Sequence, residues 1–225
     1  IRFISKTITK VRPNIILVLG DRYEMIAAPI AALPFKIPIV HFYGGAVTYG
    51  AIDELVRHSI SKMSHLHFTA INAYKKRVIQ MGESPKNVYC VGGLGVDNIK
   101  STSLYSKSAL EKKLNIKFKN FFSLVTCHAE TLKKKSSLSN LKCLFDALKN
   151  MKETTVIFTM PNSDIESMVI YNSISKFVSK RKNFYLYKSL GQKTYYSCCK
   201  HSDFMIGNSS SGLLEMPTFK KFTIN

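Results

Sequence analysis

The sequence predicts an α/β protein built on parallel sheets. Short, continuous apolar runs have the composition of buried strands, and amphipathic helical segments alternate with them along the chain. This alternation occurs twice, on either side of a Ser- and Lys-rich stretch in residues 97–120. We therefore expect two domains with doubly wound sheets, 1–96 and 97–225, whose ligand-binding loops lie at the carboxyl ends of the strands.

The first domain is predicted to contain helices over 1–11, 22–34, 51–63 and 71–81, and strands over 15–19, 37–41, 65–69 and 87–91. Asp21 and Glu24 have capping-box spacing for the second helix, which Pro29 should kink or bring into close approach with a neighbour. The third helix carries apolar residues at helical spacing, which predict its buried stripe: Ile52, Leu55, Val56, Ile60 and Met63. Residues 92–98 are predicted to form a turn-rich exit.

The second domain repeats the pattern. Helices are expected over 107–114, 136–150, 164–179, 192–200 and 212–217, and strands over 121–126, 155–159, 183–187, 203–206 and 222–225. Because the chain begins without Met inside a predicted helix and stops on a predicted strand, it is expected to be a fragment that lacks both termini of a longer protein.

The composition narrows the functional classes. The 33 basic and 14 acidic residues among 225 give a net charge of +19. This suggests an anionic partner, either nucleic acid or a phosphorylated small molecule, and the alternative is an excess of lysines that only line solvated helices and loops. The lysines are scattered and no basic block has interleaved aromatics, so a nucleic-acid-binding role is not expected. No apolar run approaches the ~20 residues of a membrane span, and no signal peptide is visible. The 5 cysteines include no C-x-x-C pair, which fits a protein of the reducing cytoplasm.

One candidate site follows the first two strands. Gly20-Asp21-Arg22 ends the first strand, and a loop with Gly44 and Gly45 follows the second. This loop leads into a helix whose first turn carries Asp53 and Glu54, each four residues before a basic partner, Arg57 and His58. Ordinary surface pairs worth ~0.3–0.5 kcal/mol are the alternative, as is a plain helix cap for Asp21. His65 and His67 have no third ligand nearby, so no metal site is expected.

The second candidate site is an anion cradle at Gly207–Gly212. Asn208, Ser209 and Ser210 lie between a strand and a helix, where backbone amides and hydroxyls can hold phosphate. Glu215 could accept hydrogen bonds from ribose hydroxyls, and His128 directly after a strand is an acid/base or phosphate candidate. The alternatives are a simple helix cap, a structural histidine, and, for Asn162 after another strand, a turn former.

Together these motifs resemble the hydrolysing UDP-N-acetylglucosamine 2-epimerases of sialic- and legionaminic-acid biosynthesis. The resemblance spans nearly the whole chain and is carried by four motifs: Gly20-Asp21-Arg22-x-Glu24; His41-x-x-Gly44-Gly45-x-x-Thr48-x-Gly50-x-Ile52-Asp53-Glu54-x-x-Arg57-His58; Ser61-Lys62-Met63-Ser64-His65-Leu66-His67; and Gly207-Asn208-Ser209-Ser210-Ser211-Gly212-x-x-Glu215-x-Pro217.

The resemblance implies two Rossmann-like domains of the GT-B type, the first truncated at its amino terminus. It implies elimination of UDP from the sugar followed by hydration to N-acetylmannosamine, without a cofactor, on UDP-N-acetylglucosamine or its GDP analogue, in a family that is often homo-oligomeric. It makes Asp21, Asp53 and His128 the catalytic residues. Asn162, which follows another strand, and the remaining matched positions are expected to bind substrate: Arg22, Glu24, Gly44, Gly45, Glu54, Arg57, His58, Asn208, Ser209, Ser210, Gly212 and Glu215.

The sequence departs from this family in the glycine loop. Tyr43 and Ala46 stand at positions where the family usually carries carboxylates. This favours, as one alternative, a catalytically impaired remnant that still binds nucleotide sugar. A GT-B glycosyltransferase is the other alternative, because a ribose-binding Glu after a glycine- and serine-rich loop also suits a transferase.

Overall fold

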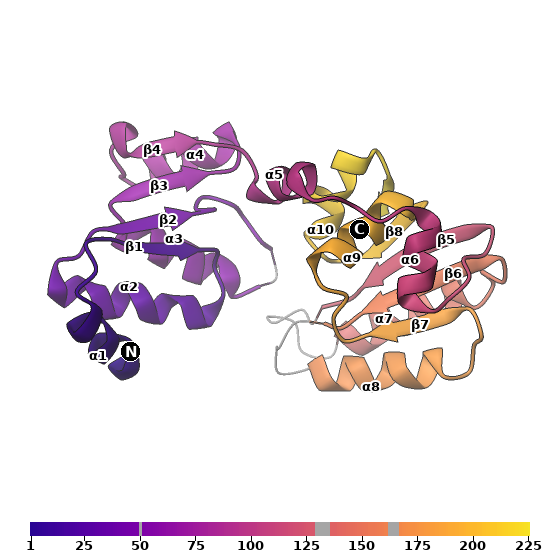
Figure 1. Cartoon of the computed structure of the whole chain (residues 1–225). Coiled ribbons are helices and arrows are strands. Elements are labelled where there is room, and N and C mark those ends of the chain that lie inside the picture. Colours follow the sequence, from indigo (N-terminus) through magenta and orange to yellow (C-terminus); the bar gives the residue numbers. More distant parts are fainter. Residues whose placement is uncertain (50, 129–135, 162–166) are drawn as a thin grey trace. The chain divides into compact units, whose positions relative to one another are not determined.

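The structure is a computed structural model that describes residues 1–49, 51–128, 136–161 and 167–225, with side chains of the helix at 136–148 described from residue 139. The chain forms two compact units, Ile1–Leu94 and Gly95–Asn225, against an expected division after residue 96. Each is a Rossmann-like α/β unit (Figure 1), which confirms the predicted fold class.

Unit 1 contains a parallel sheet in the order β1-β2-β3-β4. Its strands are β1 (Ile16–Leu19), β2 (Ile39–Phe42), β3 (Leu66–Thr69) and β4 (Val88–Cys90). Its helices are α1 (Arg2–Val11), α2 (Ala27–Ala32), α3 (Asp53–Met63) and α4 (Asn72–Gln80), with 3-10 turns at Tyr23–Ile26, Leu33–Phe35 and Pro85–Asn87. The short apolar runs at the predicted positions form these four strands.

The sheet of unit 1 has two different faces. Val18, His41, His67 and Val88 lie side by side across the four strands and are fully buried. On this side Ile8 of α1, Ala32 of α2 and Ile60 of α3 complete a core with Val18 and Ile39. Several apolar side chains on the other face are exposed, among them Leu17, Leu19 and Tyr89, whereas Val40 is buried.

Unit 2 contains a parallel sheet in the order β7-β6-β5-β8-β9. Its strands are β5 (Phe121–Thr126), β6 (Thr154–Thr159), β7 (Phe184–Tyr187), β8 (Phe204–Gly207) and β9 (Phe222–Ile224). Its helices are α6 (Lys107–Leu114), α7 (Ser136–Leu148), α8 (Ser167–Val178), α9 (Gln192–His201) and α10 (Ser211–Leu214), followed by a 3-10 turn at Met216–Phe219. The direction of winding reverses between β5 and β8, and this reversal is the switch point at which such sheets bind ligands.

Three local predictions were wrong. The expected helix over 22–34 is a 3-10 turn, the short helix α2 and a second 3-10 turn, with no side-chain cap, because the Asp21 carboxylate pairs with Arg57 instead. Leu55, predicted to be buried, is 68% exposed, while Arg57 on the same helix is buried. The expected turn at 92–98 contains the start of α5 (Leu94–Ser101), which packs through the buried Ile99.

Candidate functional site

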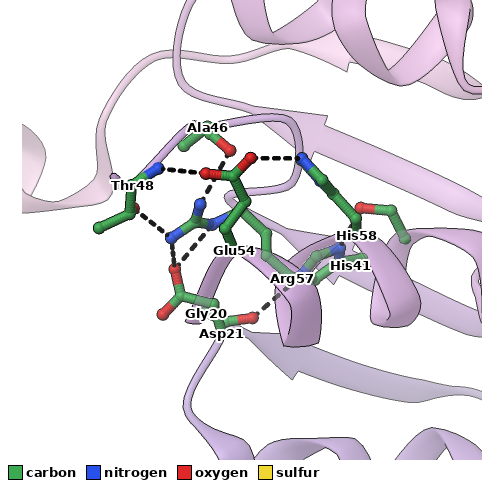
Figure 2. A network of polar contacts seen from close by, with 9 residues as sticks. Gly20, Asp21, His41, Ala46, Thr48, Glu54, Arg57 and His58 are labelled. Carbon is green, nitrogen blue, oxygen red and sulfur yellow. Dashed lines mark hydrogen bonds and ion pairs between the residues drawn. The ribbon is translucent and has the colours of Figure 1, made fainter. Parts of the chain in front are cut away.

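The centre of the site in unit 1 is a fork of hydrogen bonds from Arg57 (Figure 2). Its Nε donates to Asp21 Oδ2 at 2.7 Å, and its Nη2 also bonds to that oxygen and to Thr48 Oγ1 at 2.9 Å. Its Nη1 donates to the Ala46 carbonyl at 2.8 Å. Arg57 is 4% exposed on α3, so one buried guanidinium connects the end of β1 to the glycine loop.

Glu54 makes a second contact with the same loop and pairs with His58 on its own helix. Glu54 Oε2 accepts a hydrogen bond from the Thr48 amide at 2.9 Å, and its Oε1 lies 3.8 Å from His58 Nε2. Burial lowers the pKa of His58, and the carboxylate of Glu54 opposes this shift. The predicted Glu54–His58 pair is therefore present, and the Glu54 carboxylate also supports the loop through the Thr48 amide.

The two predicted glycines of this loop are needed for close packing. A Cβ on Gly44 would lie 2.8 Å from Ser61 Oγ, and one on Gly45, whose φ is +83°, would lie 2.4 Å from the Tyr74 carbonyl oxygen. Arg77 of α4 also donates to the Gly45 carbonyl. Tyr43 has a φ of +68°, a conformation that costs a non-glycine residue about 1 kcal/mol or more.

The structure places the other predicted residues of unit 1 at different distances from this hydrogen-bond network. Asp53 is the first residue of α3 and is half-buried. Glu24 is exposed and pairs with Arg22 at 3.6 Å. The structure thus brings Asp21, Glu54, Arg57 and His58 together around the loop, and it leaves Glu24 outside that network.

In unit 2, His128 and Asn208 connect the two strands at the switch point. The His128 amide donates to Asn208 Oδ1 at 2.7 Å, and Asn208 Nδ2 donates to the His128 carbonyl at 3.0 Å. These residues follow β5 and β8, which pair along their length. Asn208 therefore fixes the backbone that carries His128. The sequence places Asn208 in the anion cradle but does not predict this second role.

The two hydrogen bonds between His128 and Asn208 form a brace across the strand ends. A pocket beside this brace has a volume of ≈ 470 Å³, which is in the range typical of small-molecule sites. Its lining includes four of the predicted residues, His128, Ser209, Ser210 and Glu215. Gly212 does not line it: its Cα packs against Thr223, whose hydroxyl donates to the Gly212 carbonyl at 2.9 Å. Asn162 lies outside the described residues.

Glu215 holds an unsatisfied acceptor at this pocket. Its Oε2 is buried and has no hydrogen-bond partner among the described residues. Gly95 of α5 lies close on the other side, since a Cβ there would be 3.1 Å from Glu215 Oε1. A buried carboxylate oxygen without a donor is costly, so this position is suited to a ligand that supplies a hydroxyl or amide hydrogen.

Sequence reasoning missed a row of hydroxyls in the same pocket. Thr126 and Thr159 end β5 and β6, and their Oγ1 atoms are 2.5 Å apart. Tyr195 of α9 bonds to the Ser211 hydroxyl. A threonine as the last residue of two neighbouring apolar strands was the available signal, because the carboxyl ends of parallel strands meet at one edge of a sheet.

Two cysteines of unit 2 lie in surroundings that suppress their reactivity. Burial raises the pKa of Cys127, beside His128, to about 11 and that of Cys198 to about 12, so both thiols stay protonated and unreactive near neutral pH. In the part of the chain that the structure describes, no three His, Cys, Asp or Glu side chains cluster as metal ligands. No described helix has the length and apolar character to cross a membrane.

Comparison with known proteins shows the family of this chain. The family model described as UDP-N-acetylglucosamine 2-epimerase matches residues 1–225. The chain belongs to this family. It is 40% identical over 222 residues to the GDP/UDP-N,N'-diacetylbacillosamine 2-epimerase (hydrolyzing) of Campylobacter jejuni subsp. jejuni serotype O:2, covering 98% of this chain and 58% of that protein. It is 42% identical over 211 residues to the polysialic acid biosynthesis protein P7 of Escherichia coli, covering 93% of this chain and 54% of that protein.

Solved structures of epimerases have the same fold. The UDP-GlcNAc 2-epimerase of Methanocaldococcus jannaschii, in complex with UDP-GlcNAc and UDP, matches with a TM-score of 0.83 at 19% identity, over 99% of this chain and 62% of that one. The Neisseria meningitidis enzyme bound to UDP-GlcNAc matches with a TM-score of 0.81 at 18% identity, over 99% and 62%. The chain thus spans less than two thirds of the proteins it resembles.

The buried histidine of β2 predicts how the stability of this epimerase-family chain depends on pH. Burial lowers the pKa of His41 from 6.5 to about 4, only partly offset by its bond to the Gly20 carbonyl and by Asp21, while His67 and Arg57 lower it further. Between these two values the unfolded chain binds a proton that the folded chain does not. Stability should therefore fall as the pH drops below 6.5, with His41 contributing a loss of roughly 2 kcal/mol by pH 5.

Urea unfolding followed by circular dichroism at pH 7.5 and pH 5 measures this loss. A His41→Gln variant cannot take up the proton, so its own loss between the two pH values should be smaller by that amount. An equal loss in the two proteins would contradict the prediction.

Proposed function

We propose that this chain carries the nucleotide and sugar sites of a hydrolysing UDP-N-acetylglucosamine 2-epimerase, which converts UDP-N-acetylglucosamine to N-acetylmannosamine and UDP. Its membership of the family and a relative with "hydrolyzing" in its name support this. The observation that carries the nucleotide part is the buried, unpartnered Glu215 oxygen in a hydroxyl-lined pocket at the switch point.

The proposed reaction begins at C2 of the sugar. A carboxylate removes the C2 proton, the electron pair left behind forms the C1=C2 bond, and the bond from C1 to the diphosphate oxygen breaks to release UDP. Water then adds its hydroxyl to C1 and a proton to C2 of the resulting glycal. The proposal assigns Asp21 and Asp53 to the sugar and His128 to the departing diphosphate, where stabilisation of negative charge favours elimination.

At the nucleotide end, Ser209 and Ser210 are proposed to contact the diphosphate and Glu215 the ribose. Their position beside the His128–Asn208 brace supports this, because a phosphate held there lies at the switch point of the sheet. A ribose hydroxyl that donates to Glu215 would satisfy its buried oxygen. UDP and GDP present the same ribose and diphosphate, so this part of the proposal covers both nucleotides.

A Glu215→Gln variant should therefore bind UDP roughly 10- to 100-fold more weakly, the effect of losing a hydrogen bond to a charged group. Isothermal titration with UDP and with 2′- and 3′-deoxy-UDP measures it. The parent protein should prefer UDP over at least one deoxy analogue, and the variant should lose much of that preference. The exposed Glu153→Gln serves as the matched control and should bind like the parent. Equal affinity of Glu215→Gln and parent for UDP would refute the ribose assignment.

The reaction itself is tested by incubating the protein with UDP- or GDP-N-acetylglucosamine in D₂O and following the products by NMR. Epimerisation through a glycal should give N-acetylmannosamine that carries deuterium at C2, together with free nucleotide. N-acetylglucosamine that retains its C2 proton would instead indicate simple hydrolysis, the side reaction expected of a glycosyltransferase.

The second candidate function is binding of nucleotide sugar with impaired turnover. Two observations favour it: Tyr43 and Ala46 supply no carboxylate to the loop, and Asp21 and Glu54 are already engaged by Arg57 and Thr48. On this reading UDP binds without release of N-acetylmannosamine. An Ala46→Glu variant should then gain turnover while its affinity for UDP stays unchanged, and Ala46→Gln, which matches it in size without the charge, should gain none.

A further inference from the structure

His41 is a polar side chain in a position that apolar residues normally occupy. It lies on β2 at the centre of the buried row across the sheet of unit 1 and is fully buried. Burying a polar ring costs free energy unless both of its nitrogens find partners. The partners of His41 therefore indicate what the residue does.

Both ring nitrogens are satisfied by groups that belong to the site. Nε2 lies 3.0 Å from the Gly20 carbonyl oxygen, and Nδ1 lies 3.0 Å from Ser61 Oγ on α3. A carbonyl can only accept, so Nε2 must carry the hydrogen, and in a neutral ring Nδ1 then accepts from the Ser61 hydroxyl. Burial lowers the pKa of His41 to about 4, which keeps the ring neutral near pH 7.

The bond to Gly20 acts on the residue that follows it. The Gly20 amide donates to the Phe42 carbonyl at 3.2 Å, so β2 holds Gly20 through its amide. By way of His41, β2 also holds the Gly20 carbonyl (Figure 2). Gly20 has a φ of +86°. Because glycine adopts many backbone conformations, the chain could leave the strand in other directions at this residue. Fixing both of its groups fixes the direction in which Asp21 leaves the strand.

The two carboxylate oxygens of Asp21 have different surroundings. Arg57 binds its Oδ2 through two nitrogens, and Oδ1 has no partner among the described residues. The glycine loop rests on the same histidine–serine pair, since a Cβ on Gly44 would lie 3.1 Å from His41 Nδ1 and closer still to Ser61. One hydrogen-bond chain thus supports both the carboxylate and the loop opposite it.

We propose that His41 and Ser61 are positioning residues. His41, as the Nε2–H tautomer held by the Ser61 hydroxyl, fixes the Gly20 carbonyl and thereby aims Asp21 Oδ1, the oxygen that has no partner among the described residues. The part of this inference that concerns turnover rests on the proposed function, because it takes Asp21 to act on the sugar. The part that concerns the tautomer and the carboxylate stands on the geometry alone.

His67 provides a matched comparison within the same sheet. It lies opposite His41 on β3 and is equally buried, yet its Nε2 faces Glu83 Oε2 at 3.3 Å and touches neither Gly20 nor Ser61. A merely structural role for buried histidines predicts similar consequences when either one is replaced. A positioning role predicts that only His41 affects Asp21.

The test compares His41→Gln, His41→Leu and Ser61→Ala with His67→Gln. Nitrogen NMR of the parent should show the Nε2–H tautomer at His41, and the carboxyl carbon resonance of Asp21 should move in His41→Leu but not in His67→Gln. In steady-state assays with UDP-N-acetylglucosamine, His41→Leu should lower kcat roughly 10- to 100-fold with little change in KM. His41→Gln, whose side-chain amide can still donate to Gly20, should recover part of the loss.

Other outcomes separate the two proposals. Nδ1–H at His41, or an unmoved Asp21 resonance in folded His41→Leu, would overturn the positioning role. If the parent turns over no sugar while the tautomer and the Asp21 shift are as expected, the proposed function fails and the positioning role stands. If His41→Leu does not fold, the tautomer in the parent and the Asp21 resonance in Ser61→Ala decide the question.

Discussion

A Gly207→Ala variant should lose about 3–5 kcal/mol of stability and the affinity for UDP that is proposed above. Gly207 ends β8 with a φ of +132°, and a Cβ there would lie 1.9 Å from the Thr126 carbonyl oxygen on β5. This contact involves backbone on both sides, so relief requires the two strands to separate. Their separation would break the His128–Asn208 bonds and open the pocket edge. Urea unfolding and UDP titration measure the two effects.

Gly92→Ala is the matched control. Gly92 also has a positive φ, +87°, but nothing lies within 4 Å of a Cβ built on it. It should show only the backbone penalty of about 1 kcal/mol and normal UDP binding. If Gly207→Ala proved no worse than Gly92→Ala, the close approach of β5 and β8 would not be what requires glycine.

The fold class could be predicted because parallel strands buried on both faces appear in the sequence as continuous apolar runs. Phe121–Thr126 is one such run, and it forms β5 over the predicted residues. Where a strand ends was also predictable, so Asp21, His128 and Asn208 were found as candidates. The helix α5 was missed because Gly92, Gly93 and Gly95 favour a turn, while the burial of Ile99 that helps hold the helix depends on packing.

The errors in the site have a common physical origin. Helical periodicity counts apolar residues, so it placed Leu55 in the core and left Arg57 outside. Arg57 is buried because four of its contacts go to Asp21, Ala46 and Thr48, and those partners come from two other segments of the chain. Likewise, nothing local to Asp21 distinguishes a helix cap from an ion pair with a residue 36 positions away. Residue spacing encodes local geometry, whereas these pairings are consequences of the tertiary fold.

Replacing Arg57 by Met should destabilise unit 1 by roughly 3 kcal/mol, the lower end of the range for breaking a buried ion pair. The lower end applies because Asp21 is 26% exposed and water would reach part of its charge. The loss should concentrate in the glycine loop, whose Ala46 carbonyl and Thr48 hydroxyl both bond to the guanidinium. Arg57→Lys should recover little of it, because an ammonium cannot reproduce a fork that reaches three groups. Urea unfolding and hydrogen exchange of the loop amides are the measurements.

A double-mutant cycle identifies the source of this loss. Asp21→Asn removes the charge that Arg57 neutralises, so Arg57→Met should cost less in the Asp21→Asn background than in the parent, by on the order of 1–2 kcal/mol. The destabilisation by Arg57→Met that persists in the Asp21→Asn background measures the hydrogen bonds to Ala46 and Thr48. Loss of these bonds should appear as faster hydrogen exchange of the loop amides in both backgrounds. Strict additivity of the two substitutions would mean that the Asp21–Arg57 pair contributes no coupling energy. The guanidinium would then act as a clamp on the loop, and Asp21 would depend for its orientation on Gly20 and His41 alone.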